Sequence, residues 1–136
     1  MSPDVVRRKL SAIADYLKDL RRHEGITFEA FMERHYEVER ILELLIMNAS
    51  DIIMHLLSSR GEAPSATYRA AFLRAGEIGI ISEELSRNLS LSAGLRNILA
   101  HEYDQIDYSV IHNSIPAALR DFTRLIDELG KEDIDS

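Results

Sequence analysis

The stretch FEAFMERHYEVERILELLIMNASDIIMHLLSS, residues 28–59, repeats its apolar residues at the spacing of an α-helix. Its main apolar stripe consists of Phe31, Val38, Leu42, Leu45, Ala49, Ile52 and Leu56. A second apolar set widens the arc well beyond that stripe and comprises Ile41, Leu44, Ile46, Ile53 and Leu57. A helix on the surface of a bundle needs only one stripe. The breadth of this arc therefore predicts one long helix that is central in the fold or meets another subunit.

Helical periodicity continues on both sides of this segment. Apolar residues at helical spacing predict a helix over about residues 4–22, a short helix over 65–75 and a final helix over 108–129. A further element starts after Ser82 and leads into a helix over about 91–100. We expect all-α architecture, with four long helical units plus one short helix.

Several single residues predict where these helices begin and bend. Thr27, Ser82 and Asp107 are expected N-caps, because their side chains accept hydrogen bonds from free backbone N–H groups. Pro116 lies inside the final helix and removes one backbone donor, which predicts a kink there. The whole chain, residues 1–136, is expected to form one domain, with 131–136 as a polar tail.

Composition narrows the chemistry that the chain can perform. It has no cysteine, which excludes disulfides and thiolate metal sites and fits a reducing cytoplasm. No apolar run approaches the ~20 residues that span a bilayer, so we expect a cytoplasmic protein without a membrane partner. The net charge of -7 argues against broad, non-specific nucleic-acid binding but allows a local basic cleft.

The segment GLRNILAHEY, residues 94–103, gathers the groups best suited to catalysis. Arg96 is permanently charged and presents a fork of donors that fits a phosphate. His101 can give or take a proton near neutral pH, and Tyr103 supplies a hydroxyl. The sequence contains no metal-ligand cluster and no glycine-rich phosphate loop beside them. We therefore expect chemistry here on a phosphorylated substrate, with no metal and no cofactor.

Helix geometry limits how these three side chains can meet. On a straight helix Arg96 and Tyr103 would share a face about 10.5 Å apart along the axis, while His101 would point about 140° away from Arg96. The three groups cannot converge under that geometry. Either the helix ends or distorts near residues 100–102, or a second copy of the chain completes the site.

The Arg-x4-His-x-Tyr spacing resembles the signature of the HEPN superfamily, and the wider match resembles its HepT-like branch. Three stretches carry the resemblance, namely residues 38–43 running on to 51–55, residues 94–103 and residues 106–108. Together they cover about residues 5–130. The resemblance implies a HEPN-like helical bundle that acts as a homodimer, with the motifs of the two copies facing each other.

The resemblance also implies roles for individual residues. Arg96 and His101 would be catalytic in metal-independent RNA cleavage, with Asn97 and Tyr103 contacting the substrate. The chain would then be the toxin of a type VII-like toxin–antitoxin module. Its partner would be an MntA-like nucleotidyltransferase antitoxin that adds AMP to Tyr103.

Other interpretations of the sequence remain open at this stage. The chain could be a non-catalytic helical module that binds nucleotide or serves as a scaffold for the same transferase, or a plain interaction protein. Asn48, Asp51 and His55 share one face of the central helix, and we interpret them as polar interface or supporting residues rather than a catalytic set. His35 falls within the apolar stripe and is interpreted as a packing residue.

Overall fold

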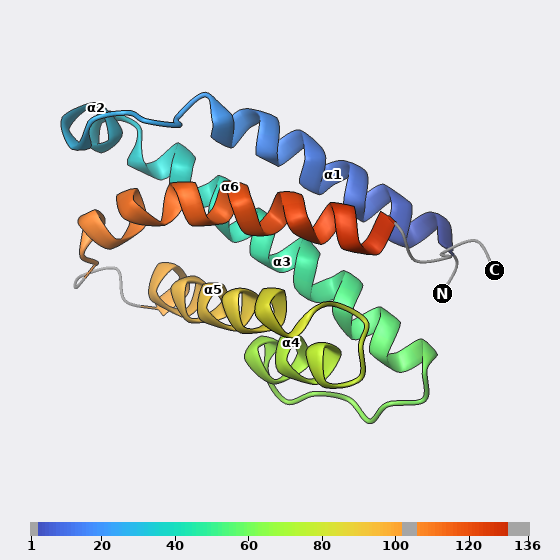
Figure 1. Ribbon diagram of the computed structural model, residues 1–136. Helices are drawn as coiled ribbons and strands as arrows, with labels where there is room; N and C mark the ends of the chain where they lie inside the picture. Colours follow the sequence, from blue (N-terminus) through green and yellow to red (C-terminus); the bar gives the residue numbers. More distant parts are fainter. Residues whose placement is uncertain (1–2, 102–105, 131–136) are drawn as a thin grey trace.

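The computed structural model describes residues 3–101 and 106–130, and all the regular structure in these ranges is helical. Figure 1 shows the six helices, which are α1 (Pro3–Arg21), α2 (Phe28–Glu33), α3 (His35–Ser59), α4 (Tyr68–Glu77), α5 (Glu83–His101) and α6 (Tyr108–Gly130). The predicted all-α class is confirmed. Four of the helices are long and two are short, whereas the sequence predicted a single short helix.

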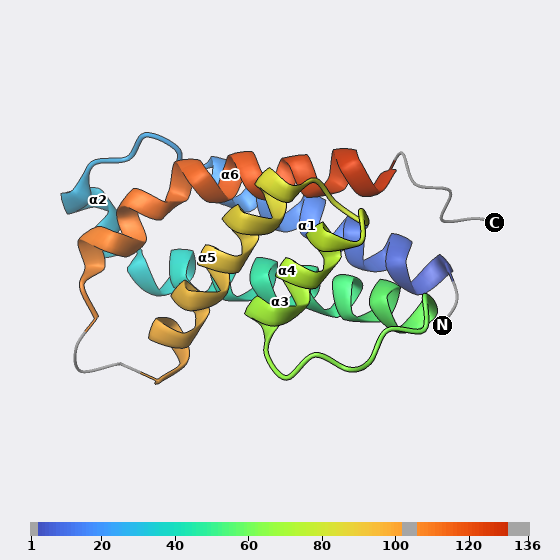
Figure 2. The same cartoon turned by 60° about the horizontal axis from the view of Figure 1, so that its bottom comes forward.

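The bundle is organised around α3. Helix α3 contacts each of the other five helices, as the breadth of its apolar arc predicted. Helix α1 packs on α3 and α6, while α4 and α5 pack on each other at the opposite edge of the bundle (Figures 1 and 2). This arrangement leaves the α4–α5 pair with one side on the core and the other side toward solvent.

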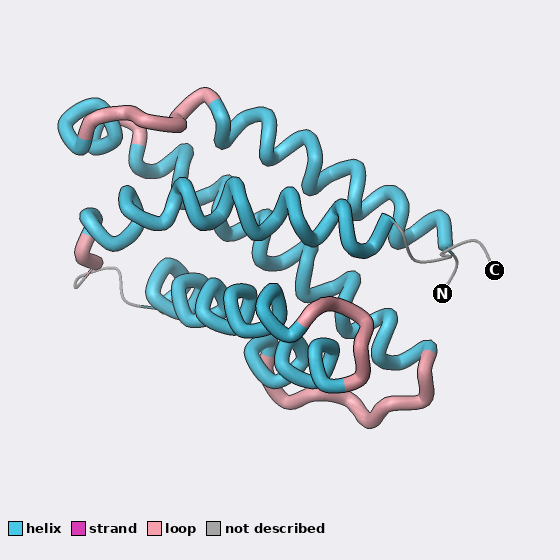
Figure 3. The backbone as a smooth tube through the Cα atoms, in the orientation of Figure 1, coloured by secondary structure: helices cyan, strands magenta, loops and turns pink. Residues whose placement is uncertain are grey.

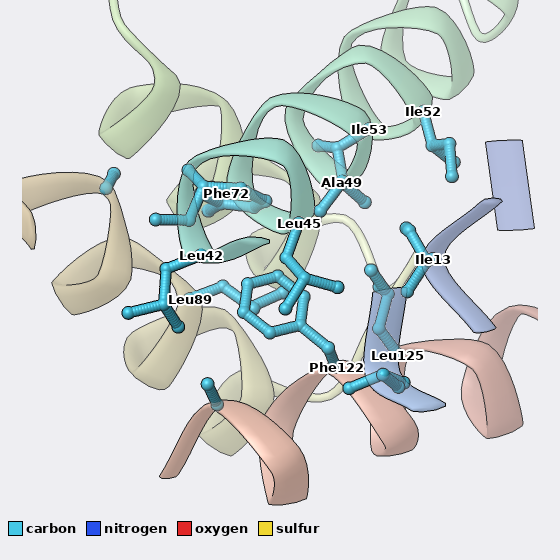
Figure 4. Packing of buried hydrophobic residues seen from close by; sticks show 14 of the residues in the cluster. Ile13, Leu42, Leu45, Ala49, Ile52, Ile53, Phe72, Leu89, Phe122 and Leu125 are labelled. Carbon is cyan, nitrogen blue, oxygen red and sulfur yellow. The ribbon is translucent and has the colours of Figure 1, made fainter. Parts of the chain in front are cut away.

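The hydrophobic core lies where the helices converge on α3. Figure 4 shows Leu45 and Ala49 of α3 among side chains from α1, α4, α5 and α6. The largest fully buried side chains are Phe31, Phe72, Phe122, Ile13, Leu20, Leu42, Leu45, Ile46, Ile52, Ile53, Leu85 and Leu89. Each such side chain contributes about 1.5–3 kcal/mol when it leaves water, so this contiguous cluster is the main source of stability.

Helix α3 is strongly apolar because it forms the centre of this core. Over its most apolar 18-residue window the mean hydropathy is 1.5, so by length and composition alone the helix is apolar enough to cross a membrane. However, 56% of that window is buried inside the bundle, as is expected of a central core helix.

The long helix predicted over residues 28–59 is wrong at one point, because the chain breaks at Arg34. Arg34 has φ -131° and ψ 17°, outside the helical region, and its N–H bonds back to the carbonyl of Phe31 to close α2. The break lets α2 turn onto α6, where the rings of Phe28 and Phe31 lie 5.7 and 5.2 Å from the His112 ring. Tertiary packing of these rings therefore outweighs local helical periodicity.

The predicted caps are confirmed, and Figure 3 shows the described loops that join the helices. Thr27 accepts from the N–H of Ala30 at 3.1 Å, and Ser82 accepts from the N–H of Leu85 at 3.2 Å. Asp107 accepts from the hydroxyl of Ser109 at 2.6 Å and from its N–H at 3.0 Å, and these two bonds hold the pKa of Asp107 below its usual value. Helix α6 continues through Pro116, where the kink stays a prediction.

Candidate active site

The sequence motif lies in the last turns of α5. The elements expected over residues 83–89 and 91–100 form one continuous helix, and this helix ends at His101. The geometric argument left two alternatives, a helix that ends or distorts near residues 100–102 or a site completed by a second copy of the chain. Both stay predictions, because residues 102–105 lie outside the described residues. Tyr103 lies outside the described residues, and of His101 only its position as the last residue of α5 is described.

Among the described residues, Arg96 contacts an aromatic ring and no carboxylate. Its guanidinium carbon lies 5.5 Å from the centre of the Tyr68 ring, in a cation–π contact. Its Nε is buried without a hydrogen-bond partner among the described residues. The terminal guanidinium nitrogens are therefore the groups that Arg96 can offer to a ligand. A cation that is not neutralised by a neighbouring acid is suited to stabilising phosphate charge.

A pocket of about 400 Å³ opens beside Arg96. Helix α5 supplies one wall, and the start of α4 with the two residues before it supplies the other. The lining residues are Ala66, Thr67, Tyr68, Arg69, Ala93, Gly94, Arg96 and Asn97. Two guanidinium groups, an amide and an aromatic ring thus share one concave surface, and no carboxylate is among these lining side chains.

The distance between α4 and α5 is set by a glycine. A Cβ built on Gly76 would lie only 2.4 Å from both the Cβ and the Oγ of Ser86. Ser86 in turn donates a hydrogen bond to the carbonyl of Phe72 at 2.8 Å. This close approach fixes the end of α4 against the start of α5, and Tyr68, at the other end of α4, reaches Arg96.

The loop that precedes α4 is anchored by an ion-pair network. Arg74 hydrogen-bonds to the carboxylates of Glu62 and Glu77, and Glu62 belongs to the loop over residues 60–67. The hydrogen bond from Arg74 lowers the pKa of Glu62, so this carboxylate stays charged in neutral solution. Both ends of α4 are therefore restrained, one by its capping loop and the other by Gly76.

The other polar residues singled out from the sequence occupy structural positions. His35 bonds through Nδ1 to Glu39 and contacts the ring of Tyr108 at 4.7 Å, which confirms it as a packing histidine. Asp51 pairs with Lys9 at 3.1 Å, and Asn48 donates to the carbonyl of Leu44. Among the described residues, no group of three or more His, Asp or Glu side chains could hold a metal ion.

Sequence reasoning missed the contribution of α4 to this site. Tyr68 lies in the short helix expected over residues 65–75, but neither it nor Thr67 and Arg69 were singled out as site residues. The local signal is a capping threonine followed by an aromatic and a basic residue. That signal does not identify Arg96 as the contact, because the pairing depends on how α4 packs against α5.

Comparison with known proteins decides the family. The family described as Ribonuclease HepT-like matches residues 13–129. This chain belongs to the HepT-like ribonuclease family. A tRNA nuclease HepT from Aphanizomenon flos-aquae is 32% identical and aligns with 96% of this chain and 90% of that protein. An mRNA nuclease HepT from Shewanella oneidensis is 24% identical and aligns with 95% of this chain and 98% of that protein.

Solved structures confirm the HEPN-like fold of this HepT-like chain. A tri-AMPylated Shewanella oneidensis HEPN toxin in complex with an MNT antitoxin superposes with a TM-score of 0.85 at 24% identity, covering 95% of this chain and 98% of that chain. A toxin–antitoxin structure with AMP-PNP gives 0.82 at 23% identity, covering 93% and 98%. YutE from Bacillus subtilis, a cytosolic protein of unknown function, gives 0.74 at 15% identity, covering 91% and 87%.

Proposed function

We propose that this chain is the toxin of a toxin–antitoxin pair and acts in the cytoplasm as a metal-independent endoribonuclease. The observation that carries the proposal is Arg96, a cation without an acidic partner among the described residues that faces a pocket at the end of α5. His101 follows it at the spacing of the motif. Membership of the HepT-like ribonuclease family supports RNA as the substrate.

The chemistry requires a proton carrier and a cation near one phosphodiester. The 2′-hydroxyl oxygen of the RNA attacks the adjacent phosphorus, its proton leaves to a base, and the bond to the 5′-oxygen breaks as that oxygen gains a proton. His101 suits the proton transfers, because imidazole titrates near neutral pH. Arg96 stabilises the charge that builds up on the phosphorus-bound oxygens. Asn97 orients the phosphate, and Tyr103 orients the substrate.

An RNA cleavage assay tests both the metal independence and the role of His101. The purified chain, incubated with RNA in a chelator of divalent metals, should cleave it, and His101→Ala should abolish cleavage. A loss of about 10²–10⁴-fold is typical when a general acid or base is removed. Cleavage that persists in His101→Ala would exclude this imidazole as the acid or base, and cleavage that requires a divalent metal would exclude the metal-independent scheme.

A second copy of the chain is part of the proposal. A largely apolar groove of about 250 Å³ runs between α5 and α6, on a different side of α5 from the Arg96 pocket. Leu91 and Val110 line it and are 69% and 47% exposed, which is high for side chains of this type. A homodimer that covers this groove would bury them and bring two copies of α5 together.

The partner that we propose is an MntA-like nucleotidyltransferase antitoxin, which adds AMP to Tyr103. The complexes of similar fold support this, since one contains a tri-AMPylated HEPN toxin and its MNT antitoxin. AMP on this tyrosine would place a bulky anion at the end of α5 and exclude RNA. Co-expression with such an antitoxin should increase the intact mass by one or more AMP groups. Tyr103→Phe should prevent the increase, and an unchanged mass of the parent chain would contradict the modification.

A further inference from the structure

We infer that the pocket between the start of α4 and the second half of α5 binds one nucleoside monophosphate unit, with Tyr68 and Arg69 as binding residues beside Arg96. The inference rests on the proposed function and extends it to a substrate-binding subsite. Two sources share this ligand chemistry, namely a nucleotide of the RNA and an adenylate.

The charge of the pocket favours a phosphate. Arg69 and Arg96 both line it, and no acidic side chain does so. Neither arginine forms an ion pair with a described residue: Arg69 is exposed in the first turn of α4, and Arg96 contacts the Tyr68 ring. In a chain with a net charge of -7, two unneutralised guanidinium groups in one cavity form a local site for an anion.

The walls of the pocket favour a base attached to that phosphate. The Tyr68 ring is half-buried, packs partly against the hydrophobic core and has the Arg96 guanidinium over it, so its position is fixed and a base would contact the part of the ring that stays exposed in the pocket. Aromatic side chains bind nucleotides by stacking on the base, whichever base it is. The amide of Asn97 is exposed on the opposite wall and can both donate and accept hydrogen bonds.

The size of the pocket also fits, and a glycine keeps it open. Its volume of about 400 Å³ is within the range of about 300–1,000 Å³ that small-molecule sites occupy. Gly94 lies in its lining, and a Cβ built there would meet nothing within 4 Å. A Cβ at position 94 therefore has room, and we expect a larger side chain there to occupy space in the pocket that Gly94 lines.

Gly94 provides the decisive test. Gly94→Leu should fill the pocket while the fold is kept, because leucine is a better helix former than glycine and has room. Gly130→Leu is the matched control, since Gly130 ends α6, is exposed and also has open space around its Cβ. Arg69→Gln tests the charge and Tyr68→Leu the stacking, with Tyr68→Phe as the variant that keeps the ring.

Binding is measured in the full chain carrying His101→Ala, so that RNA stays intact. The probes are a fluorescently labelled, unstructured oligoribonucleotide, followed by anisotropy, and 5′-AMP, followed by calorimetry. Gly94→Leu, Arg69→Gln and Tyr68→Leu should each raise Kd about tenfold, the scale of one stacking or charged contact. Gly130→Leu should bind as the parent does, and Tyr68→Phe should bind more tightly than Tyr68→Leu, because phenylalanine keeps the ring. Loss of RNA binding alone assigns the subsite to RNA, and loss of AMP binding alone assigns it to an adenylate.

Unchanged affinity for both probes in Gly94→Leu would overturn the inference. The cleavage assay on the chain with His101 intact separates this failure from failure of the proposed function. If the chain cleaves RNA and Gly94→Leu cleaves it equally well, the subsite is wrong and the ribonuclease stands. If the chain does not cleave RNA but binds AMP in a manner that Gly94→Leu abolishes, the subsite stands and the ribonuclease is wrong.

Discussion

Two glycines on adjacent helices should respond to the same substitution with opposite signs. Gly76 of α4 is buried against Ser86, whereas Gly94 of α5 faces open space. Replacing either glycine by alanine removes backbone freedom from the unfolded chain, which stabilises a helix by up to about 1 kcal/mol. At Gly94 nothing opposes that gain, so Gly94→Ala should raise the free energy of unfolding by about 0.5–1 kcal/mol.

At Gly76 the same methyl group meets Ser86. The separation of 2.4 Å is well inside the 3.4 Å at which ordinary van der Waals contact begins, so α4 and α5 must move apart. The Cβ of Ser86 is fixed to its helix and cannot rotate away. Overpacking of this kind costs about 1–3 kcal/mol, which exceeds the helical gain. Gly76→Ala should therefore be about 1–3 kcal/mol less stable than Gly94→Ala.

Urea unfolding followed by far-UV circular dichroism measures both variants against the parent. Ser86→Gly in the Gly76→Ala background removes the clashing atoms and should recover part of the loss, although it also deletes the bond to Phe72. Gly76→Ala should also weaken RNA cleavage, since Tyr68 and Arg96 meet across the same pair of helices. Equal stability of the Gly76→Ala and Gly94→Ala variants would refute the reasoning that close helix contact requires this glycine.

Three further predictions follow from single contacts. Burial alone would raise the pKa of Glu128, but hydrogen bonds from Ser82 and Arg124 outweigh it and lower the pKa below 4.5. This carboxylate therefore stabilises the fold above pH 4.5 and loses its contribution as pH falls through its pKa in the folded state. Glu128→Gln should lower the free energy of unfolding at pH 7, and the difference from the parent should shrink in acid. A difference in urea midpoint that does not change with pH would contradict this. Leu91→Glu should convert the proposed dimer to a monomer in sedimentation without loss of helicity, because this side chain is 69% exposed; an unchanged sedimentation coefficient would remove the groove from the interface. Thr67→Ala deletes the cap of α4 and should cost about 1 kcal/mol; thermal melting checks this, with Ala70→Ser on the exposed side of α4 as a control that leaves the cap intact.

The features that sequence predicted well are those fixed by local chemistry. The caps at Thr27, Ser82 and Asp107 are where they were expected, because each depends on one side chain and a backbone N–H two or three residues later. The central role of α3 also followed from its own apolar arc. The Arg96 motif could be found because its spacing resembles a known family.

The features that sequence did not predict depend on packing between elements. The break at Arg34 exists because Phe31 turns toward α6, and nothing in residues 28–59 alone requires this. The contact of Tyr68 with Arg96 requires the α4–α5 distance, which Gly76 sets. From the sequence alone, a glycine in a predicted helix indicates only weak helix propensity. Its role in close helix packing becomes visible only when the neighbouring helix is known.

The apolar groove and the Arg96 pocket lie on two different sides of α5, and this separation affects how the activity of such a protein can be inhibited. Leu91 and Leu95 border the apolar groove, whereas Gly94 and Asn97 border the pocket. A protein that occupied only the groove would leave the pocket reachable from solvent. On the function proposed above, effective inhibition therefore needs a chemical group that occupies the pocket itself, and a small covalent adduct would supply one that remains after the delivering protein has departed.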